Sequence, residues 1–320
     1  MARSRFGWQK QSLQFSLSAA VAAAVLSSAC VAPAPVPGRG PDAVVSQDGV
    51  RAHLSAAESV DGGLLLISLK VPRSARGLAS KEAPIAEYEG RQFPLYSVGA
   101  EDEGLWEAPL GVPFNKDPGQ DRVVLWLGKP GASEKIELPF RIIPGSYRSE
   151  VLSVSGKHIN PSPAEVARIK REGAEIKKLY ERQTLTKHWA GQFLFPIESP
   201  VTSPFGTKRV YNGEMKSFHT GLDLKAPIGT AVRSAASGEV VLAKDLFMTG
   251  KTVILDHGYG VFTVYAHMSR LKVRPGQVVN PRQLLGLSGM TGRSSGPHLH
   301  WGAVVQKSKI DPIFLTRLMR

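Results

Sequence analysis

Hydrophobic residues form short runs along the first half of the chain and are seldom spaced as on a helix. Apolar runs at residues 64–71, 123–127 and 136–142 alternate with clusters of Gly, Pro, Asp and Asn. Short apolar runs bounded by turn residues are typical of β-strands. The pattern therefore predicts a β-sandwich of about a hundred residues, at residues 44–148, which serves as an accessory domain.

A second series of strand-like runs fills the last third of the chain, after Phe193. Apolar stretches around residues 240–243, 252–255, 261–266 and 299–305 are separated by Gly, Pro and Asn. These turn residues break the chain into strands. We predict a second all-β domain at residues 193–320, which makes the protein mainly β.

One helix is predicted between the two β regions. Ser162 precedes Pro163, and Glu165 stands three places after Ser162, which is the pattern of a capping box with proline at the first helical position. The apolar residues that follow at helical spacing are Val166, Ile169, Ile176 and Tyr180. We predict a helical connector at residues 149–192 whose apolar stripe packs on a neighbouring domain; a helix lying on a membrane surface is the alternative.

The amino-terminal residues have the pattern of an export signal. Arg3, Arg5 and Lys10 provide a positive start, and residues 17–26 form a short Ala/Val/Leu run that ends in small residues. No later apolar run approaches the length needed to cross a bilayer. We predict a signal peptide at residues 1–29 and a protein exported to the periplasm or cell envelope.

Cys30 is the only cysteine of the chain and directly follows this apolar run, so an internal disulfide is excluded. Its position favours lipidation, and with it anchoring in the outer membrane as a lipoprotein. The sequence before it resembles a bacterial lipobox but has Ser27 where an apolar residue is usual. Ordinary signal cleavage after Ala29 therefore remains an alternative. The Pro- and Ala-rich residues 30–43 are predicted to be a tether.

The net charge of +13, from 40 basic and 27 acidic residues, favours an anionic partner. The basic residues are spread along the chain, and neither a zinc finger nor an RNA-binding aromatic signature is present, so a nucleic acid is not the predicted partner. An anionic cell wall or membrane surface fits the charge equally well.

Five of the eight histidines lie in the last domain, and the strongest local pattern is His298-Leu299-His300. Residues two apart on a strand face the same side, so both imidazoles are predicted to face one pocket. A histidine pair on a rigid strand is suited to present ligands to zinc. His219 and Asp223 provide an imidazole and a carboxylate with Gly221 between them. This pair by itself is also consistent with an ordinary surface histidine and a solvated carboxylate.

His267 ends an alternating run, where a histidine packed in the core is as plausible as a functional one, and His257 is predicted to lie in a turn without function. Together, His219, Asp223 and His300 make a three-ligand set that leaves one tetrahedral position open for water, and a site with an open position is typical of catalysis. Zinc bound in this way brings the pKa of its water to about 7.

Two histidines outside this three-ligand set, His298 and His267, remain: one can accept the proton of the water, and the other can donate a hydrogen bond to the tetrahedral oxyanion. The chain has no His-Glu-x-x-His sequence, which excludes a thermolysin-type helix with a glutamate base. The predicted base is therefore a histidine.

The order of these motifs resembles the lysostaphin-type, or LytM-domain, zinc endopeptidases over residues 195–306. The matching segments are Ser203-Pro204-Phe205-Gly206, His219-Thr220-Gly221-Leu222-Asp223, Ala226-Pro227-Ile228-Gly229-Thr230, Ala236-Ser237-Gly238-Glu239-Val240-Val241, Tyr265-Ala266-His267, and Gly289-Met290-Thr291-Gly292-Arg293-Ser294-Ser295-Gly296-Pro297-His298-Leu299-His300. The resemblance implies an antiparallel β peptidase domain with a groove, and peptide cross-links of bacterial peptidoglycan as the substrate.

The same resemblance implies one zinc ion held by His219, Asp223 and His300, with His267 and His298 catalytic. Tyr211 is a further candidate for oxyanion stabilisation, since some relatives have an upstream tyrosine. The family includes enzymes that cut glycyl-glycine bonds and enzymes that cut D-alanyl-diaminopimelate cross-links. The predicted lipoprotein favours the second kind of bond.

Three alternatives accompany this prediction. The first is a catalytically silent LytM-type regulator that activates another wall hydrolase, although such relatives typically lack ligands that are present here. The second is a latent enzyme whose groove is covered by the β-sandwich or by the helix that begins at Pro163. The third, a biotinyl or lipoyl carrier hairpin around residues 229–241, has no lysine at a tight turn and leaves the histidines unexplained.

Overall fold

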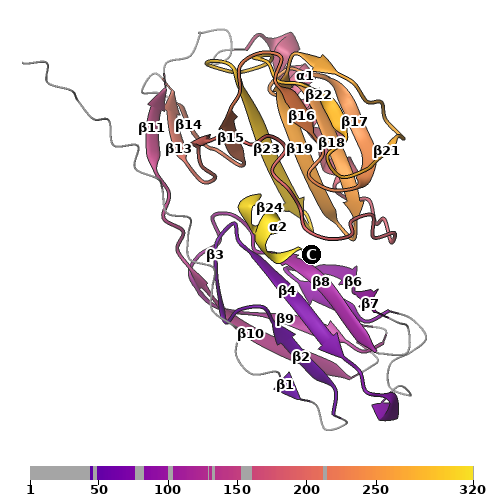
Figure 1. Ribbon diagram of the computed structural model, residues 1–320. Helices are drawn as coiled ribbons and strands as arrows, with labels where there is room; N and C mark the ends of the chain where they lie inside the picture. Colours follow the sequence, from indigo (N-terminus) through magenta and orange to yellow (C-terminus); the bar gives the residue numbers. More distant parts are fainter. Residues whose placement is uncertain are drawn as a thin grey trace, which may run out of the picture. The chain divides into compact units, whose positions relative to one another are not determined.

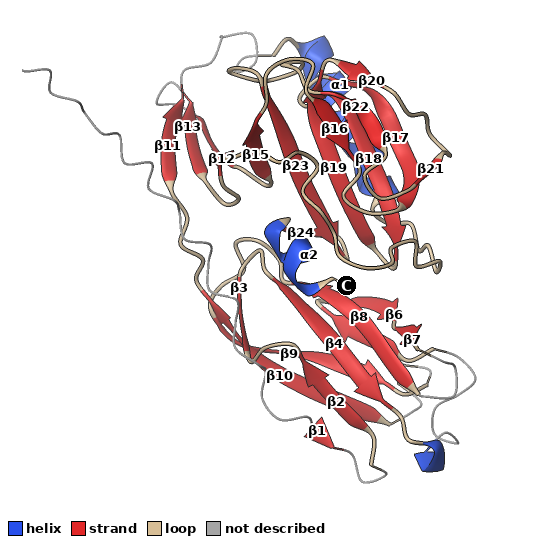
Figure 2. Ribbon diagram, in the orientation of Figure 1, coloured by secondary structure: helices blue, strands red, loops and turns tan. Residues whose placement is uncertain are grey.

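The computed structural model describes residues 44–45, 49–75, 83–99, 104–128, 130–131, 134–152, 161–211 and 215–319. The predicted signal peptide, the tether and the lipidation of Cys30 lie outside these residues and stay predictions. Over the described ranges, none of the helices is both long enough and apolar enough to cross a membrane. Strands dominate the structure, which confirms the predicted mainly β fold (Figure 2).

The predicted β-sandwich is present as two five-stranded sheets (Figure 1). The first sheet has the order β1 (Val44–Val45), β2 (Arg51–Leu54), β4 (Leu64–Lys70), β8 (Leu105–Gly111) and β7 (Tyr96–Val98). The second has the order β3 (Glu58–Val60), β10 (Lys135–Ile143), β9 (Gly119–Trp126), β5 (Ile85–Tyr88) and β6 (Arg91–Pro94). A 3-10 turn, η1 (Arg73–Ala75), follows β4.

Alternation of apolar and polar residues explains why these segments form a sandwich. In β10 the residues alternate between exposed and buried from Lys135 to Ile142, so one face of the strand enters the core between the sheets. Most strand pairs are antiparallel, as expected for a sandwich, but β3 pairs with β10 in parallel.

The carboxyl-terminal region is built on one eight-stranded antiparallel sheet (Figure 1). Its order is β12 (Val201–Ser203), β15 (Leu222–Lys225), β23 (His298–Val305), β19 (Val261–Met268), β18 (Gly250–Gly258), β17 (Gly238–Leu246) and β21 (Val278–Val279), with β24 (Ser308–Ile310) paired to β23. Two three-stranded sheets accompany it: β16 (Ala231–Arg233), β22 (Leu284–Leu287) and β20 (Arg270–Leu271), and β11 (Ser149–Leu152), β13 (Lys208–Tyr211) and β14 (Met215–Phe218).

Helix α1 (Pro163–Leu179) begins where the sequence predicts. The Ser162 side chain accepts a hydrogen bond from the Glu165 backbone, and the Glu165 side chain accepts one from the Ser162 backbone, which completes the capping box. Ile176 and Tyr180 pack on the eight-stranded sheet, where the Tyr180 and Phe262 rings lie 5.3 Å apart. The carboxyl-terminal end of the predicted apolar stripe therefore packs on the eight-stranded sheet.

The β-sandwich and the carboxyl-terminal region belong to one compact unit, Pro37–Arg320, and share an apolar cluster. Tyr96 of the sandwich meets the Trp189 ring edge-on at 5.4 Å, and the terminal helix α2 (Ile313–Leu318) packs in the same cluster. Residues 149–152 form β11 rather than part of a helix. The predicted domain boundaries stay predictions.

Candidate metal and catalytic site

Three neighbouring strands of the eight-stranded sheet bring most of the predicted site residues together (Figure 1). Asp223 on β15 lies directly opposite His300 on the adjacent strand β23, and His298 stands on the same strand two residues earlier. His267 lies near the end of β19, on the other side of β23. His219 follows β14 and enters the group four residues before Asp223.

The ligand atoms of His219, Asp223 and His300 all lie within 4.8 Å of one another. His219 Nε2 is 2.9 Å from His300 Nδ1 and 2.9 Å from Asp223 Oδ1, and His300 Nδ1 is 3.0 Å from that oxygen. Bonds of about 2.1 Å in a tetrahedral zinc site place neighbouring ligand atoms roughly 3.4 Å apart. The three atoms are therefore close to the separations that a single zinc ion requires.

Backbone hydrogen bonding orients His219 in a way that suits a metal ligand. Its Nδ1–H donates to the carbonyl oxygen of Pro204 at 2.9 Å, because a carbonyl can only accept. The proton is thereby held on Nδ1, and the lone pair of Nε2 faces Asp223 and His300. Zinc-binding histidines usually have such a partner on their second nitrogen. The donor set of two imidazoles and one carboxylate therefore fits zinc, which His219 would bind through Nε2 and His300 through Nδ1.

Gly221 lies at a bend of the backbone directly before β15, and it is also needed for steric reasons. A Cβ added at this residue would lie 2.6 Å from Cε1 of His300 and 2.6 Å from the carbonyl oxygen of Trp301. Contacts under 3.0 Å with backbone cannot be accommodated without movement. Gly221 therefore leaves room for the His300 ring.

The two remaining histidines, His267 and His298, lie beside the candidate ligand set, and Nδ1 of each is hydrogen-bonded to a backbone carbonyl. The His267 Nδ1–H donates to the Thr291 carbonyl at 2.8 Å, and the His298 Nδ1–H donates to the Gly296 carbonyl at 2.8 Å. Their rings lie 4.8 Å apart, and His298 Nε2 is 3.5 Å from Asp223 Oδ1. In both side chains Nε2 takes no part in these backbone hydrogen bonds and faces the site.

Burial and neighbouring charges keep the site in the protonation states that metal binding needs. Burial raises the pKa of Asp223, but the adjacent side chains of His219 and His300 outweigh it and hold that pKa well below its usual value. Burial lowers the pKa of His267 to about 3, with the neighbouring His300 and His298 adding to the effect. At neutral pH the carboxyl is therefore ionised and His267 is neutral.

A groove runs past these residues, as predicted for this fold. It is lined by Glu150, Thr202, Ser203, Arg209, Asp223, His267 and the segment Arg293, Ser294, Ser295, Gly296, Pro297 and His298. Two candidate catalytic histidines and one candidate metal ligand, Asp223, thus line the groove. The Tyr211 side chain, a candidate for oxyanion stabilisation, lies outside the described side chains.

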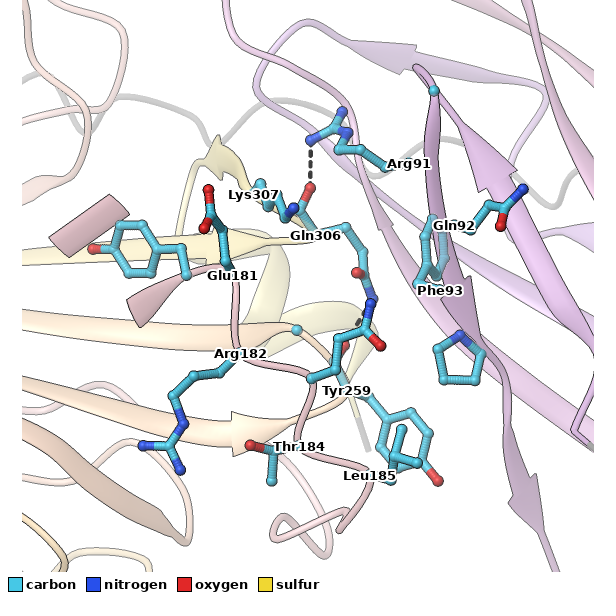
Figure 3. Close-up of a pocket in the computed structure, with 15 residues that line it drawn as sticks. Arg91, Gln92, Phe93, Glu181, Arg182, Thr184, Leu185, Tyr259, Gln306 and Lys307 are labelled. Atoms are coloured by element: carbon cyan, nitrogen blue, oxygen red, sulfur yellow. Dashed lines mark hydrogen bonds between the residues drawn. The ribbon is translucent and has the colours of Figure 1, made fainter. Parts of the chain in front are cut away.

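A second hollow, shown in Figure 3, lies away from the histidines. Some of its polar groups are bonded to one another: Arg91 donates to the Gln306 carbonyl, and the Gln306 amide donates to the Tyr259 carbonyl at 2.7 Å. No member of the histidine and aspartate set lines it. We therefore place the site in the groove.

The sequence did not single out Arg209, which contacts the carboxylate of the ligand set. Its guanidinium donates to Asp223 Oδ2, the oxygen not aimed at His219 and His300, and to Ser203 Oγ at 3.2 Å. Glu150, its neighbour in the adjacent strand β11, accepts from the same hydroxyl at 3.3 Å. In the sequence, Lys208-Arg209 has the appearance of solvated charge, and only the fold brings Arg209 to Asp223.

We expect Arg209→Ala to weaken zinc binding about tenfold to a hundredfold, because residues that orient metal ligands typically contribute that much. The Lys208→Ala variant is the matched control. Lys208 is exposed, and its replacement removes the same charge from the same strand. Competition with a zinc chelator measures both affinities. Equal affinities of the two variants would show that the hydrogen bond to Asp223 has no such role.

Comparison with known proteins identifies the region around the site. Residues 217–312 match the family model described as Peptidase family M23. The peptidoglycan DD-endopeptidase ShyA of Vibrio cholerae is 31% identical over 142 residues, which cover 44% of this chain and 31% of that protein. The DD-carboxypeptidase/endopeptidase Mpg of Neisseria meningitidis is 36% identical over 117 residues, which cover 37% of this chain and 27% of that protein.

A solved structure is similar over most of the chain. The crystal structure of a putative peptidase M23 from Pseudomonas aeruginosa has a TM-score of 0.61 and 29% identity, and the match covers 80% of this chain and 95% of that one. The match to the curated relatives, in contrast, spans about a third of their length. These similarities confirm the family resemblance that the motif order predicts.

Proposed function

We propose that this protein, which carries a peptidase family M23 domain at residues 217–312, is a zinc-dependent endopeptidase that hydrolyses peptide cross-links of bacterial peptidoglycan. The observation that carries the proposal is the convergence of His219 Nε2, Asp223 Oδ1 and His300 Nδ1 beside an open groove. A set of three protein ligands leaves a coordination position for water or substrate, which structural zinc sites do not.

In the proposed mechanism, His219, Asp223 and His300 would hold the zinc ion, which would act as a Lewis acid and bring the pKa of a water to about 7. The chain positions two further groups next to it. One of His267 and His298 accepts the proton of the attacking water through Nε2 and later returns it to the leaving amine. The other donates a hydrogen bond to the carbonyl oxygen as negative charge develops there. Fixed backbone hydrogen bonds on Nδ1 hold both rings in place.

The proposed substrate is a cross-link between peptide stems. Two relatives bear names that specify DD-endopeptidase or DD-carboxypeptidase/endopeptidase activity, and the first of these names specifies peptidoglycan. We therefore favour D-alanyl-diaminopimelate bonds over glycyl-glycine bonds. The net charge of +13 is consistent with attraction to an anionic wall. This substrate places the protein in the cell envelope, after export and with Cys30 as the proposed lipid anchor.

Zinc content and digestion of defined walls test the proposal. We expect purified protein to contain one zinc per chain and to convert cross-linked dimers into monomers in diaminopimelate-type muropeptides, as measured by mass spectrometry. A chelator should abolish cleavage, and added zinc should restore it. Walls with glycine cross-bridges provide the control for bond specificity.

Protein that holds zinc but leaves every cross-linked muropeptide intact would favour the alternative, a LytM-type regulator that activates a partner hydrolase. The same assay on protein that begins after residue 190 separates a regulator from a latent enzyme. Cleavage only by the shortened protein would show that the preceding residues cover the groove.

A further inference from the structure

Four aromatic residues join the β-sandwich to the segments that carry His219. Phe114, in the loop between β8 and β9, lies edge-on to Tyr147 at 5.2 Å, to Phe205 at 5.0 Å and to Phe218 at 5.3 Å. We call Phe114, Tyr147, Phe205 and Phe218 the aromatic cluster. Edge-to-face rings at such distances attract one another beyond their area of contact.

Two members of the aromatic cluster stand next to the atoms that orient His219. Phe218 directly precedes His219, and Phe205 directly follows Pro204, whose carbonyl accepts the His219 Nδ1–H at 2.9 Å. The two segments are also bonded to each other, because Gly206 N donates to the His219 carbonyl at 2.7 Å and His219 N donates to the Thr207 carbonyl at 2.9 Å. Phe114 therefore contacts both sides of the hydrogen bond that fixes the His219 ring.

Hydrogen bonds to Asp61 of the sandwich fix the segments that flank Phe114 and Tyr147. The Asp61 carboxylate accepts hydrogen bonds from Asn115 N at 3.0 Å and from Gly145 N at 2.8 Å, and the Tyr147 hydroxyl donates to the Asp61 carbonyl. A Cβ on Gly62 would lie 2.5 Å from Cε1 of Phe205, so the turn at Gly62 closes against that ring. Phe205 itself is only 4% exposed.

We propose that the β-sandwich positions the metal ligand His219 through the aromatic cluster, with Phe114 as its principal positioning residue. The inference rests on the proposed function for the identity of the metal and extends it to the domain whose role the sequence leaves open. Phe114 does not touch the metal ligands' donor atoms. It fixes Phe205 and Phe218, and through them the hydrogen bond between the Pro204 carbonyl and His219 Nδ1 that aims Nε2 at the metal position.

The test uses the full chain with single replacements. Zinc affinity is measured by competition with a chelator, and the ligand geometry is followed by the visible absorption spectrum of protein loaded with cobalt(II). We expect Phe114→Ala to lower zinc affinity about tenfold and to change the cobalt spectrum, because loss of an orienting partner typically has an effect of at least this size. Phe114→Tyr, which keeps the ring, should behave like the unaltered protein.

Two further variants separate positioning from general stability. Trp106→Ala removes a ring that packs on the sandwich core outside the aromatic cluster, and we expect zinc affinity and spectrum to be unchanged. Gly62→Ala pushes a methyl group against Phe205 from the sandwich side, and we expect the same direction of change as in Phe114→Ala. Near-ultraviolet circular dichroism shows whether each variant is folded. If Phe114→Ala is not folded, the result for Gly62→Ala tests the positioning role.

Unchanged zinc affinity and an unchanged cobalt spectrum in folded Phe114→Ala or Gly62→Ala would overturn the inference. The same loss in Trp106→Ala would also overturn it, because the effect would then come from stability alone. Failure of the unaltered protein to bind zinc or to cut cross-links would instead count against the proposed function.

Discussion

Replacement of His300 by alanine is expected to remove both the zinc and the activity. His300 Nδ1 is the central donor of the set, 2.9 Å from His219 Nε2 and 3.0 Å from Asp223 Oδ1. Only two protein ligands remain without it, fewer than the three that catalytic zinc sites use. Because Lewis-acid stabilisation of the transition state is worth several kcal/mol, we expect cross-link cleavage to fall by about a thousandfold or more.

Metal analysis of dialysed protein and mass spectrometry of muropeptides measure the two losses. The matched control is His257→Gln, because His257 is also a buried histidine of the same sheet but bonds to Ser237 and Thr263 away from the ligand set. We expect this control to keep one zinc per chain. His300→Ala protein that retains zinc with unchanged affinity would contradict the assignment of this residue as a ligand.

Local spacing was sufficient to predict several of the strands and the histidine pair. Leu299 is fully buried in the core, whereas His298 and His300 face the opposite side of β23, as the period of two requires. The capping box of α1 could also be predicted, because Ser162, Pro163 and Glu165 are close in the sequence. Features set by neighbours along the chain could therefore be predicted.

The position predicted for His257 was wrong for a physical reason. It directly precedes Gly258 and stands three residues before Gly260, a sequence that predicts a turn, yet it lies in strand β18 and is fully buried. Its Nδ1–H donates to the Ser237 carbonyl at 2.6 Å, and its Nε2 lies 2.7 Å from Thr263 Oγ1. The turn begins only at Tyr259, so the turn signal was placed too early.

The partners of the site residues could not be predicted from spacing. The carbonyls of Pro204, Thr291 and Gly296 orient three of the histidines, and a backbone carbonyl has no side-chain signature. Arg209 reaches Asp223 only because β13 and β15 converge, and Phe114 reaches Phe205 across ninety-one positions of the sequence. These contacts depend on how distant segments pack, which a single sequence does not specify.

The backbone at His267 favours a functional role for this residue, whereas its sequence position is equally consistent with a histidine packed in the core. His267 has a φ of 60°, which a non-glycine residue seldom adopts, at an irregularity in the pairing of β18 with β19. The backbone there is fixed because His267 N donates to the Thr249 carbonyl at 2.8 Å. Strained backbone of this kind is typical of functional sites. Here it accompanies a ring that lies 6.0 Å from His300 and 4.8 Å from His298.

Replacement of His267 by alanine is therefore expected to separate catalysis from metal binding. The ligand set of His219, Asp223 and His300 stays complete, so the protein should keep one zinc per chain. Cleavage should fall by about a hundredfold to ten-thousandfold, the range for loss of a general acid-base or oxyanion group. The KM for cross-linked muropeptides should change little, because the lost group acts on the reacting atoms rather than on the rest of the substrate.

His267→Gln sharpens the same experiment. Glutamine can still form a hydrogen bond but cannot take up a proton at neutral pH, so partial recovery of cleavage would assign His267 to the oxyanion and leave His298 as the base. No recovery would assign His267 as the base. Loss of zinc from both variants, with the fold intact, would instead place His267 among the ligands and contradict the division of the five residues into three that bind metal and two that act on the substrate.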